Sequence, residues 1–246
     1  MPYARAEAIV IRCIDYSESS VVLSLFTREF GRISALAKGA KRKSSKLTGH
    51  IDLFCHSDIV LSMSGRRERL NILADADAID EFTGTRKNLK SYCSACHAAE
   101  LVQNMTAQDD PNPELFEQLL VFLRAVERGR DAALSLFMFE ARLLVLSGFM
   151  PQLSACISCG APVRKTAAFS TRLGGVVCAD CAPGQEYLIP KVPAGVLSLF
   201  DRLASGKLTK LDRVSVSPQA VKQMRHFLDQ YESHIIGREL RSTKCL

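Results

Sequence analysis

The sequence predicts an α+β protein in which an antiparallel β-barrel precedes a helical domain that carries a compact cysteine-rich insertion. The first eighty residues read as short apolar runs separated by turns, segments with helical periodicity follow from about Thr85, and two Cys-x2-Cys pairs interrupt the helical part. At 246 residues the chain is long for a single core. We therefore expect three regions: a barrel at 1–81, a helical domain at 85–152 and 186–246, and an insertion at 153–185.

The N-terminal runs are rich in β-branched residues and contain no segment of helical period, which predicts five strands. Five strands within about eighty residues favour a small antiparallel barrel of the OB type. Such barrels often bind single-stranded nucleic acid on one face, although an SH3-like or other protein-binding barrel fits the same pattern. The predicted strands are Ala6–Ile14, Ser20–Thr27, Gly31–Lys38, Leu53–Met63 and Arg69–Ile79.

Helical spacing of apolar residues predicts the helices of the second half. Pro113 stands where the first turn of a helix is expected, and Gly148 follows the last residue of a long apolar segment, as is typical of helix starts and ends. The predicted helices are Ser91–Met105, Pro113–Arg128, Asp131–Ser147, Pro193–Ser205 and Pro218–Ile236.

The most informative feature of the chain is the set Cys156, Cys159, Cys178 and Cys181, two pairs separated by eighteen residues. Two pairs at this spacing can close a tetrahedral shell of four thiolates around one Zn²⁺ ion. Four thiolates leave no open position for water or substrate, so the zinc is expected to hold structure rather than to do chemistry. An iron–sulfur cluster or a site without metal is the alternative.

Basic residues concentrate in the predicted barrel. The net charge is +6, and residues 28–69 hold ten basic residues against four acidic ones, while residues 201–246 hold nine against five. A focused excess of this kind favours a polyanionic partner, because each neutralised phosphate releases counterions; a solvated loop is the plain alternative. The predicted phosphate contacts are Arg32, Lys38, Lys41, Arg42, Lys43, Lys46, Arg66, Arg67 and Arg69.

Aromatic residues are few in the predicted barrel, and the chain has no Trp. Most of the rings stand at apolar positions and are expected in the core, whereas base stacking needs exposed rings. We therefore expect nucleic-acid binding dominated by phosphate contacts and weak in sequence preference.

Signatures of catalysis are sparse. The sequence has no complete P-loop, no G-x-S-x-G elbow and no H-E-x-x-H helix. Asp75, Asp77, Asp80 and Glu81 form the one acidic cluster, which a metal-dependent nuclease could use but which also suits a solvated strand end. We expect no enzymatic activity and no small-molecule substrate. The N-terminus lacks a secretory signal, and no segment predicts a membrane span, which together with nine cysteines indicates a reducing, cytoplasmic location.

Seven segments of the sequence carry motifs of one known family: Glu7–Arg12, Tyr16–Glu18, Leu25–Gly31, Ala37–Arg42, Phe139–Leu144, Gly148–Pro151 and Cys156–Gly160. Together they resemble the bacterial RecO family of DNA repair and recombination mediators. The similarity runs in order over nearly the whole chain, and all four cysteines of the family's zinc module are present. Lys41 replaces an arginine common in the family, which keeps the charge but not the bidentate fork.

The resemblance implies a non-enzymatic mediator that binds single- and double-stranded DNA, anneals complementary strands, and works with RecR and single-strand-binding protein to load the recombinase at gaps. It also implies association with the nucleoid. A helical region with basic rims suits the acidic C-terminal tail of single-strand-binding protein, with Arg124, Arg128, Arg130 and Arg142 as candidate contacts. Two alternatives stay open: a scaffold whose basic loops bind an acidic protein, and a nucleic-acid-processing enzyme.

Overall fold

The computed structural model describes residues 2–64, 70–163, 166–206 and 216–246. The chain forms two compact units, residues 1–130 and 131–246. The first unit therefore contains residues 85–130 together with the barrel, whereas the sequence grouped them with the later helices.

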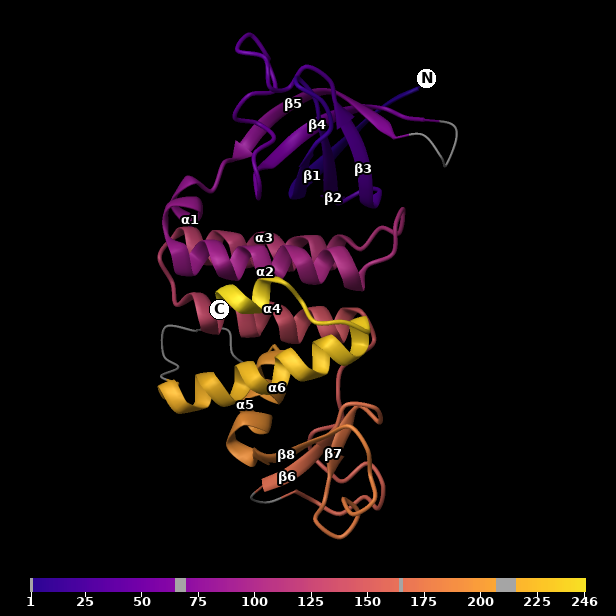
Figure 1. Ribbon diagram of the computed structural model, residues 1–246, viewed down its shortest axis with the longest axis vertical. Coiled ribbons are helices and arrows are strands. Elements are labelled where there is room, and N and C mark those ends of the chain that lie inside the picture. Colours follow the sequence, from indigo (N-terminus) through magenta and orange to yellow (C-terminus); the bar gives the residue numbers. More distant parts are fainter. Residues whose placement is uncertain (1, 65–69, 164–165, 207–215) are drawn as a thin grey trace. The chain divides into compact units, whose positions relative to one another are not determined.

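The first unit contains a closed five-stranded barrel in the order β1-β2-β3-β5-β4 (Figure 1). The first strand is shared: its C-terminal part pairs with β2 and its N-terminal part with β4, and a bulge between Val10 and Arg12 bends it between the two. A short parallel pairing of β3 with β5 closes the barrel. The strands are β1 (Tyr3–Asp15), β2 (Val21–Thr27), β3 (Gly31–Ala37), β4 (His56–Ser62) and β5 (Asn71–Asp80).

The barrel core follows from period-two alternation, because successive side chains of a strand point to opposite faces. Strand β3 alternates strictly between buried and half-buried residues, and Leu23, Ile33 and Leu61 are almost fully buried in one cluster. The five predicted strands are confirmed with two shifts, and the predicted start of the fifth, Arg69, lies outside the described residues. The first strand begins at Tyr3 rather than Ala6. The fourth begins at His56 rather than Leu53, because buried Phe54 adopts a φ of 71° that a strand cannot continue.

Helices α1 (Thr83–Lys87), α2 (Leu89–Met105) and α3 (Pro113–Glu127) complete the first unit. Local capping defines two of them: the Asn88 side chain accepts from the Ser91 N–H at 3.0 Å, and Asn112 accepts from Leu115 at 2.9 Å. Helix α2 contacts β1 and α3 contacts β2. The predicted helices Ser91–Met105 and Pro113–Arg128 are confirmed as α2 and α3, whereas the five-residue α1 was not predicted.

Arg28, the residue after β2, ties α3 to the barrel. Its guanidinium donates to Glu7 at 2.9 and 3.1 Å, pairs with Glu117, and lies 5.0 Å from the centre of the Phe116 ring. Burial alone would raise the pKa of Glu7, but the hydrogen bonds and charge of Arg28 hold it below its usual value. The helices and the barrel of this unit are thus joined by a charge-assisted contact as well as by packing.

Gly31 lies where the barrel meets the segment after α2. Its φ is 65°, and an added Cβ would overlap the carbonyl of Asp110. We expect Gly31→Ala to lower the free energy of unfolding by about 2–5 kcal/mol, since a left-handed residue costs about 1–2 kcal/mol and the overlap about 1–3 kcal/mol more. Urea titration measures the loss.

The matched control is Gly129→Ala, which has a φ of 75° but no heavy atom within 4 Å of the added Cβ. This variant is expected to lose only the conformational part, about 1–2 kcal/mol. Equal losses in the two variants would show that the approach of Asp110 is not tight.

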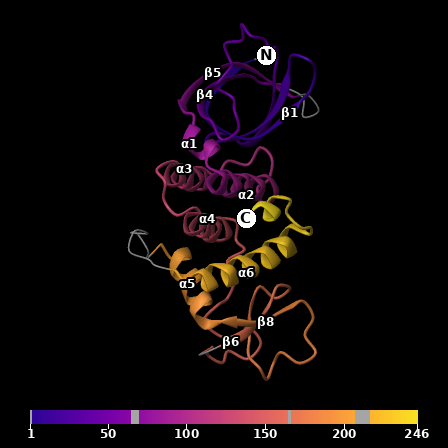
Figure 2. The same ribbon diagram turned by 60° about the vertical axis from the view of Figure 1, so that its left-hand side comes forward.

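The second unit combines helices with a three-stranded antiparallel sheet in the order β7-β6-β8 (Figure 1). Figure 2 gives a second view, with β6 and β8 of this sheet labelled. Helix α4 packs against α5, and both α5 and α6 contact β8. The three helices are confirmed close to their predicted bounds, whereas the sheet was not predicted. The elements are α4 (Ala132–Leu146), β6 (Thr166–Ser170), β7 (Gly175–Val177), β8 (Leu188–Pro193), α5 (Ala194–Ala204), α6 (Pro218–Ile236) and the 3-10 turn η2 (Ser242–Cys245).

Arg225 of α6 is the centre of a buried ionic cluster. It contacts Glu140 of α4 at 2.6 Å, Asp229 at 2.6 Å and Glu232 at 3.2 Å. The side chains of Glu140 and Glu232 are 0% and 1% exposed, so the guanidinium compensates carboxylates that water cannot reach. Burial alone would lower the pKa of Arg225, but these carboxylates raise it above its usual value.

Among the described helices, none combines the length and the apolar character that crossing a membrane requires.

Candidate nucleic-acid interface and metal centre

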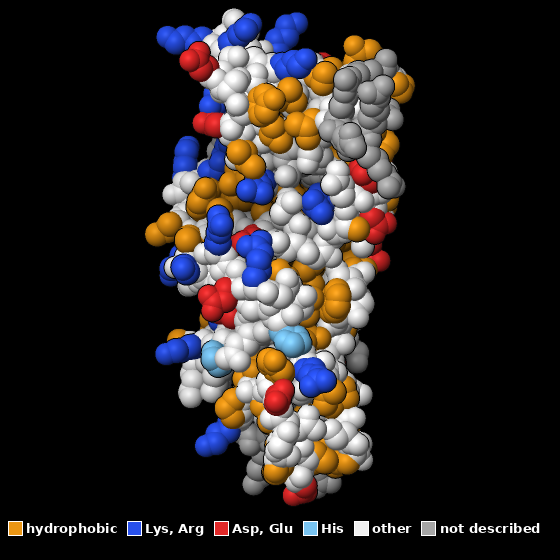
Figure 3. All heavy atoms as spheres, turned by 45° about the vertical axis from the view of Figure 1, so that its right-hand side comes forward, with side chains coloured by type: hydrophobic (Ala, Val, Ile, Leu, Met, Phe, Trp, Pro, Cys, Tyr) orange, Lys and Arg blue, Asp and Glu red, His pale blue; other side chains and the backbone are white. Residues whose placement is uncertain are grey.

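Five of the predicted phosphate contacts lie in one connection between β3 and β4. We call residues 38–46 the basic loop. Every Lys and Arg side chain in it is exposed, and Figure 3 shows several such side chains projecting around the barrel end. These five residues are Lys38, Lys41, Arg42, Lys43 and Lys46.

The basic loop is fixed to the barrel rather than hanging free of it. The Lys41 N–H donates to the Ser19 carbonyl at 3.0 Å, and the Gly39 N–H donates to the Ser20 hydroxyl at 3.2 Å. Leu47, just after the loop, is 7% exposed and belongs to the barrel core. The backbone is therefore held while the cationic side chains remain in solvent, so little order has to be gained when a ligand binds.

One cation of the loop has an acidic neighbour. Lys41 lies 2.6 Å from Asp15, but the Asp15 side chain is 77% exposed, and ion pairs this open to water contribute little. The other four cations of the loop form no ion pair with any residue that the structure describes. Their mutual repulsion favours an anionic ligand.

The remaining predicted contacts differ in status. The Arg32 guanidinium donates to the Thr106 carbonyl at 3.0 and 3.3 Å, and its burial lowers its pKa. Arg32 thus holds the end of α2 against the barrel, and no side-chain contact within the described residues joins it to the basic loop. Arg66, Arg67 and Arg69 lie outside the described residues.

Tyr16 is a surface feature that the sequence reasoning missed. Phe26 and Phe54 are buried as expected, but Tyr16 is 66% exposed and Tyr3 is 71% exposed. Tyr16 follows Asp15, the ion-pair partner of Lys41, so an exposed ring is carried by the residue next to a contact of the basic loop. Its position in a run of turn-forming residues, Asp15–Ser20, was the signal that it could not enter the core.

The candidate partner contacts do not form one group. Arg124 lies in the last turn of α3, and Arg128 and Arg130 follow it, both exposed. Arg142 belongs to the second unit, where it is half-buried and donates to the Ala204 carbonyl at 3.3 Å. Three of the four arginines therefore cluster in sequence at the C-terminal end of α3.

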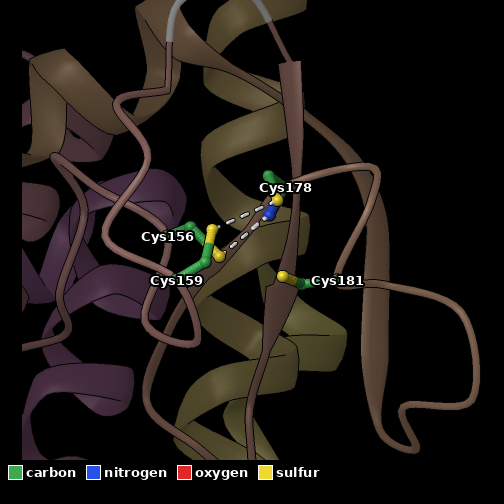
Figure 4. Close-up of side chains that lie close together, drawn as sticks. All are labelled: Cys156, Cys159, Cys178 and Cys181. Carbon is green, nitrogen blue, oxygen red and sulfur yellow. Dashed lines mark hydrogen bonds between the residues drawn. The ribbon is translucent and has the colours of Figure 1, made fainter.

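The four cysteines converge on one point of the second unit (Figure 4). All four Sγ atoms lie within 4.8 Å of one another, and those of Cys159 and Cys178 are 3.7 Å apart. Tetrahedral coordination with metal–sulfur bonds of about 2.3 Å places sulfurs about 3.8 Å apart, whereas a disulfide needs about 2 Å. The geometry fits four ligands of a single metal ion.

Local structure builds this arrangement. Cys178 directly follows β7, and Gly160, with a φ of 75°, lets the chain turn back after Cys159 so that its N–H donates to the Cys156 carbonyl at 2.8 Å. The same turn occurs after the second pair, where the Ala182 N–H donates to the Cys178 carbonyl at 3.0 Å.

The electrostatics of the cluster call for a cation. Burial alone would raise the pKa of Cys156, but the N–H groups of Cys178, Cys159 and Ser158 outweigh it and lower that pKa to about 6. Hydrogen bonds with the Cys178 and Cys159 thiols raise the pKa of Cys181 to about 12. Four crowded sulfurs cannot all ionise alone, and a divalent cation removes this obstacle.

The acidic residues that a nuclease could use do not converge. The described part of the chain brings none of Asp75, Asp77, Asp80 and Glu81 into a group of three potential metal ligands. Asp77 is 91% exposed. Asp75 and Glu81 are also exposed, whereas Asp80 is half-buried and accepts from the Phe82 N–H at 3.2 Å.

Comparison with known proteins assigns both halves of the chain to one family. Residues 1–82 match the family described as Recombination protein O N terminal, and residues 86–244 match Recombination protein O C terminal. The chain is 33% identical over 244 residues to the DNA repair protein RecO of Bacillus pumilus, covering 98% of this chain and 93% of that protein. It is 33% identical over 250 residues to the DNA repair protein RecO of Anaeromyxobacter dehalogenans, covering 100% and 96%.

Proposed function

The chain belongs to the RecO family, and from this premise we propose that it is a DNA repair and recombination mediator. It binds single- and double-stranded DNA and anneals complementary strands. It also helps RecR to load the recombinase on gaps coated by single-strand-binding protein. It does so without catalysing a reaction, in the cytoplasm and in association with the nucleoid.

The observation that carries the DNA-binding part is the basic loop held on a closed barrel. Its cations are exposed, its backbone is fixed, and the exposed Tyr16 follows Asp15, the ion-pair partner of Lys41. Strand number, closure and the crossover that brings β3 beside β5 fit a Greek-key barrel of the OB type, whose loops and one face bind single strands in other proteins.

This surface suits annealing for a physical reason. Contacts to phosphate neutralise the repulsion between two strands but leave the base edges free to pair. The exposed Tyr16 ring adds base stacking, which tolerates any sequence because every base has an aromatic face. Neither step needs hydrolysis of a nucleotide.

We assign one zinc ion to the four cysteines. Four thiolates favour zinc over magnesium or calcium, which prefer oxygen ligands, and they leave no coordination position for water. Cys156, Cys159, Cys178 and Cys181 would therefore stabilise the fold of the second unit rather than take part in a reaction.

Replacing Lys41, Arg42 and Lys43 together by Ala tests the DNA-binding proposal. With about six phosphate contacts, log K against log salt concentration is expected to fall with a slope near −4 for single strands, at roughly −0.7 per contact. The triple variant is expected to bind all sequences more weakly and to reduce the slope by about two, with a nearly unchanged melting temperature because the side chains are exposed. Titration with fluorescent mixed-sequence DNA measures the slope.

A control variant, Lys90→Ala with Arg202→Ala and Lys222→Ala, removes three exposed charges elsewhere. It separates the local effect from the loss of net charge and is expected to change the slope much less. The proposal fails if the two triple variants behave alike, or if the Lys41, Arg42 and Lys43 variant still anneals DNA and binds it with an unaltered salt slope. In either case the basic loop is only a solvated loop.

The protein partners are proposed to bind away from the basic loop. A peptide that alternates Asp with apolar residues and ends in Phe, like an acidic protein tail, is expected to bind near the C-terminal end of α3. Arg128 and Arg130 are exposed there to pair with its carboxylates. Arg128→Ala with Arg130→Ala should weaken its binding in a fluorescence titration at low salt. Cross-links confined to the barrel would contradict this placement.

A further inference from the structure

A cavity of about 720 Å³ opens in the second unit, between the segment before β8 and the C-terminal part of α6 with the residues after it. This volume lies in the range of ligand sites. The cavity shares no residue with the cysteine cluster, the basic loop or the arginines at the end of α3. It therefore needs an explanation of its own.

Two aromatic rings stand at the cavity. Tyr187 is 61% exposed, and its ring centre lies 5.8 Å from that of His234 on α6. The backbone of Tyr187 has a φ of 57°, a conformation that costs free energy, and its carbonyl accepts from the Thr171 N–H at 3.1 Å and the Thr171 hydroxyl at 3.2 Å. The ring is thus held at the surface by a strained and anchored backbone rather than by burial.

The charged side chains that line the cavity are two cations and two carboxylates. Arg238 and Lys244 line it and are exposed. Of the two lining carboxylates, Asp229 pairs with Arg225 at 2.6 Å, which leaves Glu239 as the carboxylate opposed to the two cations. Gln230 is exposed; its amide nitrogen lies 2.8 Å from His226 Nε2, and its amide oxygen can accept a hydrogen bond from a ligand. A flat ring system with a phosphate group matches this combination of aromatic, amide and cationic side chains.

We propose that this cavity binds a nucleotide of a second single strand of DNA, with the base stacked on Tyr187 and His234 and the phosphate paired with Arg238 and Lys244. The inference rests on the proposed function, because an annealing protein has to hold two strands. The basic loop of the first unit holds one strand mainly by its phosphates. The cavity of the second unit presents the complementary strand with its own contacts.

Photo-cross-linking of the full-length protein tests the site. A short mixed-sequence strand containing 5-iododeoxyuridine is added to protein already bound to a first, unlabelled and non-complementary strand, and the products are mapped by mass spectrometry. An adduct on the peptide containing Tyr187 or His234 is expected. Adducts restricted to the first unit would overturn the proposal.

Variants test the contribution to annealing. Tyr187→Leu is expected to slow annealing about tenfold, since base stacking on one ring is worth roughly that factor, and Tyr187→Phe should keep the rate because the ring remains. Arg238→Ala with Lys244→Ala should also slow it, whereas the charge-matched Arg202→Ala with Lys222→Ala should not. The affinity for a first strand is expected to change by less than about twofold in all of them, because the basic loop supplies most phosphate contacts.

The outcomes separate this site from the proposed function. The cavity site is overturned if Tyr187→Leu and the Arg238 and Lys244 double variant both anneal DNA at the normal rate. If the basic-loop triple variant loses DNA binding in the same experiments, the proposed function still stands. Normal behaviour of all three variants overturns both. Should Tyr187→Leu melt at a lower temperature than the parent, the exposed pair Arg238 and Lys244 decides the question alone.

Discussion

Cys156→Ser is expected to abolish metal binding and to unfold the sheet β6–β8 with the turns that carry the cysteines. Cys156 is the most buried of the four ligands and receives the Cys178 N–H at 3.4 Å. The binding free energy of a structural metal is folding free energy, on the order of 10 kcal/mol in small zinc domains, so its loss is expected to outweigh the packing of this sheet against α5 and α6. The purified parent should contain about one zinc per chain by elemental mass spectrometry.

The control for this substitution is Cys245→Ser, which changes an exposed cysteine outside the cluster and should keep both the metal and the melting temperature. Cys178→Ser is expected to behave like Cys156→Ser, as is the parent protein after prolonged treatment with a strong chelator. A metal-free parent with unchanged melting would contradict the structural role.

Arg225→Met is expected to lower the free energy of unfolding by about 3–5 kcal/mol. The substitution keeps an unbranched side chain over the Phe137 ring but leaves Glu140 and Glu232 buried without their cation, and an uncompensated buried charge is among the costliest changes in a core. Urea titrations of parent and variant measure the loss as a lower midpoint at unchanged slope.

Two further variants separate charge from packing. Arg225→Lys keeps the charge but loses the fork that reaches three carboxylates, so an intermediate loss is expected. Adding Glu140→Gln to Arg225→Met should recover part of the stability, because it removes one of the stranded charges. If Arg225→Met is as stable as the parent, the cluster is hydrated and contributes little.

Elements set by local signals could be predicted from the sequence. The helix that begins at Pro218 has Ser217 as its N-cap, with the Ala220 N–H donating to the hydroxyl at 3.2 Å, and both residues are readable as a start signal. The strict alternation of β3 and the convergence of the cysteine pairs follow from periodicity and spacing in the same way. Helix starts, strand alternation and metal-ligand spacing depend on residues close in sequence, so they can be predicted without the structure.

Features that depend on distant parts of the chain could not be predicted. Strand β7 is three residues long and exists because β6 pairs with it. In the sequence, Arg32 is one more cation in a basic segment. In the structure its guanidinium donates to the carbonyl of Thr106, which is distant in the sequence. The exposure of Tyr187 depends on which residues the folded core leaves outside, whereas the turn-forming residues around Tyr16 already indicate that its ring is exposed.

The pairing of the strands also limits how other proteins can attach. A closed barrel has no free outer strand along most of its wall, and where β3 has only a short pairing with β5, its Arg32 carbonyl accepts from the Asp109 N–H at 3.0 Å. The outer strands of the second sheet are β7, which is very short, and β8, whose Pro190 and Pro193 have no N–H to donate. Strand addition, the commonest route by which extended peptides and misfolded chains join a sheet, is therefore blocked in both described sheets. Partner proteins have to recognise side chains, and the folded chain is protected against edge-to-edge aggregation.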